Sequence, residues 1–446
     1  MVIFRRITAT TMASIVLLAM PVRAQPKSPA VAVAVAVAVA VMPAPMLKTR
    51  LDELVNLLNG NGDYNKLFSP AFRQAVQQSQ FETIIGTLHT QGGMAMNANS
   101  IAPSTPWQAI AKIDYQHLIA TIQITVDSTD PHLITGLLIT GAEPRDDSIT
   151  KLKSDFSKLR GSAGFGIYRL DDETITSVAE LNGNAVAPLG SAFKLWILAE
   201  AAQEVVSGQR HWSDVVQVGR HSLPSGILQN WPAHAPVTLQ TLATLMISIS
   251  DNTAADTLLT TLGQHKVGDV VRTIRISDPD RTLPVLSTLQ AFQLKMPAHG
   301  ALAGQWAKGT PEARERILAT NGAAFSATPI DPHVFDGSPL RSETIEWFAS
   351  PLDMARTLNW LRVHGDATTS AILAVNPGVG PATVARFAYL GFKGGSEPGV
   401  ITLNFLVRTK GGQWLAITGN WHDPNAAVDE LQFVSIMNRA LMLAAS

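Results

Sequence analysis

Residues 188–205 read PLGSAFKLWILAEAAQEV, a short turn followed by apolar residues at helical spacing. Pro188 and Gly190 favour the turn, and the apolar run after it predicts a buried helix. Ser191 stands where this helix begins. Lys194 follows three residues later, so both side chains lie on one face of the helix. The segment therefore predicts a buried helix whose first turn carries a hydroxyl beside an amine.

A serine beside a buried lysine can form the core of a catalytic site. A serine hydroxyl is a weak nucleophile until a base takes its proton, and burial lowers a lysine pKa so that the neutral amine can be that base. The helix N-terminus also favours a developing oxyanion. The pattern alone is weak, because Ser148 and Lys151 repeat it in a polar helix, where we expect no catalytic role.

A second motif, Ser250-Asp251-Asn252, comes directly after the apolar helical segment 242–249. A hydroxyl here can relay a proton to a leaving group, and an asparagine amide can hold a substrate carbonyl or a lysine ammonium. The alternative is that the motif only caps a helix, because serine, aspartate and asparagine are all common helix caps.

A third motif, Lys393-Gly394-Gly395-Ser396, follows the predicted strand 387–392. Two glycines in a strand indicate close approach by a ligand or by another backbone, and a lysine beside them can anchor a carboxylate. The alternative is a solvated strand end with a bulge.

The segment that contains these motifs has strands at both ends and helices between them. We expect a helix over 147–159, a hairpin of strands 164–170 and 174–181, a mostly helical region to 382, strands 387–392, 400–408 and 414–421, and a final helix over 426–443. This order predicts an α+β domain in which one antiparallel sheet is covered by a helical region.

The three motifs together resemble those of the penicilloyl-serine transferase superfamily, most closely the class A β-lactamases. Their signatures are Ser-x-x-Lys, Ser-Asp-Asn and Lys-Thr-Gly, in this order and with similar separations. The resemblance covers residues 146–446 and implies a β-lactamase/transpeptidase-like serine hydrolase domain. It implies that Ser191 is the acylated nucleophile, that Lys194 activates it, and that Ser250 passes a proton to the leaving nitrogen.

The resemblance also implies the substrate contacts. Asn252 would contact the substrate amide and Lys393 would attract a carboxylate. The oxyanion hole would consist of the backbone N–H groups of Ser191 and of Ser396, the residue after Gly395. No cofactor and no metal are implied.

The sequence departs from the class A pattern at two places. Lys-Gly-Gly replaces Lys-Thr-Gly, which removes one hydroxyl, and we expect the Ser396 hydroxyl to be its replacement.

Residues 281–311 contain no Asp or Glu, although class A enzymes place the deacylating Glu between the second and third motifs. Ser287, Thr288 and Gln290 occupy this region, and a glutamine cannot take a proton from water. Glu346 is a remote substitute that we expect on a structural helix.

These departures leave three functions open. The first is hydrolysis of β-lactam amides or related carboxylate-bearing esters and amides through an acyl-enzyme. The second is an esterase or D,D-peptidase with slow β-lactam turnover. The third is a non-hydrolysing protein that binds β-lactams or cell-wall peptide. The intact motif residues favour catalysis, and the missing Glu favours binding.

The chain ahead of this domain divides into three parts. Residues 1–24 have the charged and apolar regions of a cleaved signal peptide, which predicts a periplasmic or secreted protein without a stable membrane anchor. Residues 25–45 contain an Ala/Val low-complexity linker. Residues 46–145 predict helices followed by strands, a small α+β accessory domain that resembles the NTF2-like cone.

Composition excludes several classes of function. The 34 basic and 35 acidic residues nearly cancel, which argues against nucleic-acid binding. The absence of cysteine excludes disulfides and thiol nucleophiles. The 11 histidines form no His-x-His or His-x-x-x-His pair typical of zinc. We therefore expect a small-molecule substrate as the partner.

Overall fold

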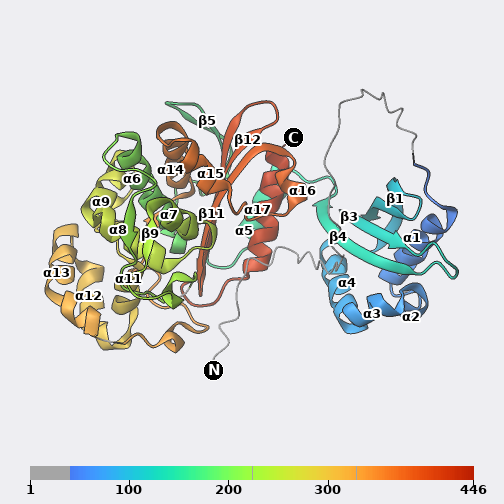
Figure 1. Cartoon of the computed structure of the whole chain (residues 1–446), viewed down its shortest axis with the longest axis horizontal. Helices are drawn as coiled ribbons and strands as arrows, with labels where there is room; N and C mark the ends of the chain where they lie inside the picture. The colour runs from blue at the N-terminus through green and yellow to red at the C-terminus, as the bar shows by residue number, and fades with distance from the viewer. Residues whose placement is uncertain (1–40, 224, 328, 446) are drawn as a thin grey trace, which may run out of the picture. The chain divides into compact units, whose positions relative to one another are not determined.

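The computed structural model describes residues 41–445 apart from 224 and 328 (Figure 1). The predicted signal peptide and most of the predicted linker lie outside these residues. The described residues form two compact units, one that ends at Asp147 and one that begins at Ser148. In the described part of the chain, no helix combines the length and the apolar character needed to cross a membrane.

The first unit has helices followed by a four-stranded antiparallel sheet in the order β1-β2-β3-β4. Its elements are α1 (Pro45–Leu58), α2 (Tyr64–Leu67), α3 (Pro70–Ala75), α4 (Gln78–Gly92), β1 (Ala95–Thr105), β2 (Gln108–Tyr115), β3 (Leu118–Val126) and β4 (Ile134–Pro144). The sequence predicts β3 and β4, whose alternating Ile, Leu and Thr residues are typical of strands, but not β1 or β2. β1 contains mostly Ala, Asn and Ser, which carry little strand propensity, and β2 mixes Ile and Tyr with Ala, Lys and Asp.

The second unit is built on a five-stranded antiparallel sheet in the order β11-β12-β13-β5-β6. These strands are β5 (Ser162–Leu170), β6 (Ile175–Leu181), β11 (Phe387–Glu397), β12 (Val400–Thr409) and β13 (Trp414–His422). The expected hairpin and the three late strands are therefore confirmed, and β11 continues through the whole third motif. As an edge strand, β11 pairs on one side only, with β12.

Helices cover both faces of this sheet, because its strands alternate between two hydrophobic cores. Phe405 and Ile417 face α5 (Ile149–Ser157) and α17 (Glu430–Ala444). Leu406 and Ala416 face the larger core of the helical region. That region contains α6 (Lys194–Val206), α7 (Leu239–Ser248), α8 (Asn252–Leu262), α9 (Gln264–Thr273), α10 (Pro279–Thr282), α11 (Thr288–Lys295), α12 (Gly300–Lys308), α13 (Pro311–Ala327), α14 (Pro351–His364), α15 (Ala367–Ala374) and α16 (Pro381–Val384).

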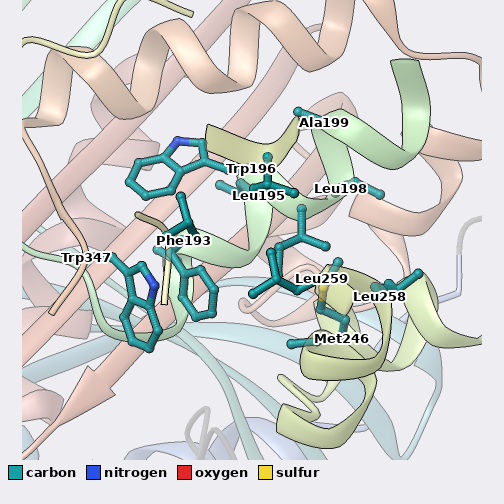
Figure 2. Packing of buried hydrophobic residues seen from close by; sticks show 14 of the residues in the cluster. Phe193, Leu195, Trp196, Leu198, Ala199, Met246, Leu258, Leu259 and Trp347 are labelled. Atoms are coloured by element: carbon teal, nitrogen blue, oxygen red, sulfur yellow. The ribbon is translucent and has the colours of Figure 1, made fainter. Parts of the chain in front are cut away.

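Helix α6 lies at the centre of the helical region and is buried on nearly all sides, as its largely apolar sequence predicts. Figure 2 shows Trp196 and Leu198 of α6 in the same cluster as Met246 of α7 and Leu258 of α8. A helix packed in this way cannot move without disrupting its neighbours, so it provides a rigid base for the residues of its first turn.

Candidate active site

Ser191 lies in a single 3₁₀ turn, Gly190–Phe193, directly ahead of α6. Gly190 has φ +49°, a left-handed conformation that favours glycine. The ring of Phe193 stacks on Trp347, with 3.7 Å between ring centroids (Figure 2). The Leu189 amide donates to the Trp347 carbonyl at 2.9 Å. The turn is therefore held from behind by the segment around Trp347.

Lys194 joins the first two motifs. It is fully buried, and its Nζ lies 3.1 Å from Ser191 Oγ and 2.6 Å from Asn252 Oδ1. The same amine lies 2.6 Å from the Ser250 carbonyl oxygen and 3.2 Å from Ser250 Oγ. Lys194 is thus within proton-transfer distance of both serine hydroxyls.

The second motif combines a helix cap with side-chain contacts to Lys194. Asp251 caps α8 by accepting from the Ala254 amide at 2.8 Å, as the capping alternative predicts. Ser250 has φ +58° and Asn252 donates to the Leu223 carbonyl at 3.0 Å. These conformations direct the Ser250 hydroxyl and the Asn252 amide oxygen toward Lys194.

Lys393 completes the constellation from the edge strand β11. Its Nζ lies 3.0 Å from Ser250 Oγ and 2.5 Å from the Gly394 carbonyl oxygen. The Ser250 hydroxyl therefore lies between two buried amines, Lys194 and Lys393. The structure brings together five of the predicted side chains, from the 3₁₀ turn Gly190–Phe193, α6, the α7–α8 turn, α8 and β11.

Glycine in the third motif allows two backbones to meet. A methyl group built on Gly395 would lie 2.2 Å from the Leu189 carbonyl oxygen and 2.5 Å from the Ser191 amide nitrogen. A methyl group on Gly190 would lie 3.1 Å from the Ser396 amide nitrogen. The close backbone approach expected of these glycines therefore occurs between β11 and the Ser191 turn, and it places the Ser191 and Ser396 amides side by side.

The expectation for the Ser396 hydroxyl is wrong. Side chains alternate along a strand, so Ser396 lies on the opposite face of β11 from Lys393 and Gly395. Its hydroxyl hydrogen-bonds Glu430 at the start of α17. Only the backbone N–H of Ser396 remains available to the site.

Burial controls the charge of the two amines. Desolvation lowers the pKa of Lys194 to about 7, although Asp256 and Asp251 raise it in part. Desolvation, and next the neighbouring Lys194, hold the pKa of Lys393 well below its usual value. Neither amine forms an ion pair with a carboxylate among the described residues. The neutral form of Lys194 is therefore accessible near neutral pH.

The side chains of residues 281–311, the region without Asp or Glu, make structural contacts. Ser287 and Gln290 form a reciprocal cap at the start of α11. Thr288 donates its backbone N–H to Asp256 at 2.6 Å and its hydroxyl to the same carboxylate at 2.9 Å. Leu283 is buried in the hydrophobic core. None of these residues can act as a base on water.

Asp256 is a neighbour of Lys194 that the three sequence motifs do not indicate. It lies on α8 one turn after Asn252, and its position four residues beyond the second motif was the available signal. Burial raises its pKa to about 6, although the Leu289 and Thr288 contacts oppose this. Its ionised form raises the pKa of Lys194, so Asp256 tunes the proposed base without contacting it.

Glu346 is not on a helix, so that expectation is wrong. It lies in the bend before the short strand β10 (Phe348–Ala349), which pairs with β7 (Ala187–Pro188) just ahead of the Ser191 turn. The side chain is buried and pairs with Lys295 at 2.7 Å. Pairing between β10 and β7, remote in sequence, brings Glu346 here.

Residues 146–320 match the family model described as the beta-lactamase enzyme family. The second unit is a β-lactamase-like domain. The matched range includes the first two motifs of the β-lactamase-like domain, whereas Lys393 lies beyond it and joins them through the fold. No curated protein matches the chain.

Several solved structures also resemble the β-lactamase-like domain. A β-lactamase from Sphaerobacter thermophilus DSM 20745 is 19% identical, with a TM-score of 0.45, over 67% of this chain and 96% of that chain. PBP-A is 16% identical, with a TM-score of 0.45, over 66% of this chain and 95% of its own. A β-lactamase from Francisella tularensis is 14% identical, with a TM-score of 0.45, over 67% and 97% respectively.

Proposed function

We propose that the β-lactamase-like domain forms an acyl-enzyme at Ser191 with β-lactams or related carboxylate-bearing esters and amides. The observation that carries this proposal is the contact between Ser191 Oγ and the buried amine of Lys194 at 3.1 Å. A neutral amine in this position can take the serine proton as the hydroxyl attacks a carbonyl carbon.

The acylation step uses each contact in the site. Ser191 Oγ bonds to the substrate carbonyl carbon while its proton passes to Lys194 Nζ, and the oxyanion accepts from the Ser191 and Ser396 amides. The bond from carbon to the leaving nitrogen or oxygen then breaks. Ser250 Oγ donates its proton to the leaving atom and regains one from Lys194, 3.2 Å away. The acyl group remains on Ser191.

Lys393 and Asn252 are proposed to bind the substrate. Lys393 projects from β11 beside Ser250, where a substrate carboxylate would give its buried amine the counter-charge that the protein does not provide. Asn252 already holds Lys194 through its amide oxygen, so it is proposed to orient both the amine and the substrate amide.

Hydrolysis of a penicillin acyl-enzyme is expected to be slow. Among the described residues, no carboxylate contacts Ser191 or Lys194, and the stretch 281–311 provides only caps and core side chains. The geometry therefore favours a domain that is readily acylated and releases a β-lactam slowly, as an esterase or D,D-peptidase would.

An intact-mass time course of the mature protein tests this function. With benzylpenicillin we expect an adduct that forms and then persists for hours, and with a simple ester we expect steady turnover. An adduct that clears within seconds would show an efficient β-lactamase with another deacylation base. No adduct from penicillin, cephalosporin or ester would contradict the catalytic proposal and favour a binding protein.

Export of the mature protein is part of the same proposal. Its support is the signal-like sequence of residues 1–24. The protein recovered from the periplasm or medium is expected to have the mass of a chain that begins at Gln25. A full-length mass confined to the cytoplasm would contradict it.

A further inference from the structure

A buried ionic cluster lies beside the Ser191 turn. Lys295 Nζ is 2.7 Å from Glu346 Oε1 and 2.5 Å from Glu397 Oε2. The side chains of Lys295 and Glu346 are each 2% exposed, and that of Glu397 is 19% exposed. The three residues come from the end of α11, the bend before β10 and the end of β11, so the cluster joins three segments that are remote in sequence.

The second carboxylate oxygen of Glu346 reaches the turn itself. The backbone N–H of Gly190 donates to Glu346 Oε2 at 3.1 Å. A continuous chain of polar contacts therefore runs from Gly190 through Glu346 and Lys295 to Glu397. Gly190 directly precedes Ser191, and Glu397 directly follows Ser396. The chain thus links the neighbours of the two amides that form the proposed oxyanion hole.

No side chain separates these two amides, because the backbones meet through Gly190 and Gly395. Their spacing must therefore be set by whatever holds the Ser191 turn and the end of β11 from outside. Besides the Leu189–Trp347 backbone hydrogen bond, two side chains of the same short segment do so. Trp347 stacks on Phe193, as Figure 2 shows, and Glu346 binds the Gly190 amide.

The charges of the cluster suit this role. Burial lowers the pKa of Lys295, but the two carboxylates outweigh it, so this pKa is raised and the amine is cationic. Burial, and next the neighbouring Glu346, raise the pKa of Glu397 to about 8. The Lys295 cation therefore lies between the carboxyl groups of Glu346 and Glu397, while Glu346 Oε2 accepts from the Gly190 amide.

We infer that Glu346 is a positioning residue that, through Gly190 and the Lys295–Glu397 pair, sets the separation of the Ser191 and Ser396 amides in the proposed oxyanion hole. This inference rests on the proposed function. Loss of one oxyanion donor typically lowers kcat about 10²–10³-fold, because a preorganised donor costs no rearrangement during reaction. Misplacing the pair is expected to lower acylation by a similar factor.

The test compares two replacements of Glu346 by quenched-flow mass spectrometry with benzylpenicillin. Glu346→Leu removes the acceptor and is expected to lower the maximal acylation rate about 100-fold, with little change in the half-saturating concentration. Glu346→Gln keeps an oxygen for the Gly190 amide, and Lys295 keeps Glu397, so its rate is expected to stay within about fivefold of wild type.

A buried glutamate at the far end of α6 provides a matched control. Glu204 is buried and pairs with Arg210 and Lys266. Glu204→Leu and Glu204→Gln are expected to lower the melting temperature and leave the acylation rate of the folded protein near wild type. If Glu346→Leu does not fold, Glu346→Asp replaces it, because its shorter side chain keeps a carboxyl group and loses the reach to Gly190.

The outcomes separate the inference from the function on which it rests. The inference is supported if acylation is slow in Glu346→Leu or Glu346→Asp, within about fivefold of wild type in Glu346→Gln, and unchanged in the two Glu204 variants. Wild-type acylation in the Leu or Asp variant, or equal losses at Glu346 and Glu204, overturn it while the function stands. Absence of any adduct on the wild-type protein overturns both.

Discussion

Ser191→Ala is expected to abolish the penicillin adduct and to lower ester hydrolysis by about 10⁴-fold or more, because the variant lacks the hydroxyl that carries the acyl group in the proposed reaction. Loss of the hydroxyl leaves the turn and α6 in place, since Ser191 is followed by residues anchored in the core. Intact mass detects the adduct, and ester turnover measures the residual rate. Binding of penicillin to the variant is expected to persist.

The chain provides a matched control for this experiment. Ser148 and Lys151 form the same Ser-x-x-Lys pattern, and Ser148 caps α5 by accepting from the Lys151 amide at 3.2 Å. Ser148→Ala is expected to cost about 1 kcal/mol of stability as a lost cap and to leave acylation unchanged. Hydrolysis retained by Ser191→Ala would show that another residue is the nucleophile.

Lys194→Met is expected to lower the acylation rate about 10²–10⁴-fold, the range usual for loss of a general base. Methionine keeps much of the volume of the buried side chain but cannot accept the Ser191 proton. Rapid-quench acylation with benzylpenicillin measures the effect. Lys151→Met, the equivalent change in the pattern formed by Ser148 and Lys151, is expected to leave the rate unchanged.

The pH dependence of the wild-type protein tests the same role. The pKa of Lys194 is about 7, so the neutral amine decreases about tenfold for each pH unit below this value. The acylation rate is expected to fall accordingly below pH 7 and to level off above pH 8. Asp256, with a pKa of about 6, adds a second ionisation on the acid side. A rate that is constant from pH 5 to pH 9, or a Lys194→Met variant as fast as wild type, would contradict the assignment.

Local patterns in the sequence were sufficient for most of the elements of the fold. The apolar spacing of α1 indicates which face of that helix is buried, and the largely apolar sequences of α6 and β12 indicate elements that are buried on nearly all sides. The strands β1 and β2 were missed because their pairing depends on neighbouring strands more than on their own residues.

The candidate site shows the same division. Ser191 and Lys194 could be placed together from the sequence, because helical geometry brings positions i and i+3 onto one face. Lys295 and Glu346 could not, because they are 51 residues apart and meet only through the packing of α11 against the segment before β10. Asp256 was missed for a related reason, since its influence on Lys194 acts through the buried environment that both share.

The sequence by itself determined the nucleophile candidate, the amine beside it, and the order of the three motifs. Covalent geometry and helical periodicity establish such short-range relations, whatever the rest of the chain does. Only the tertiary structure decided that Lys194 is fully desolvated, that Ser250 lies between two amines, and that Glu346 binds the Gly190 amide. Desolvation and contacts between remote segments exist only after packing excludes water, and they control both the charge of the proposed base and the spacing of the proposed oxyanion donors.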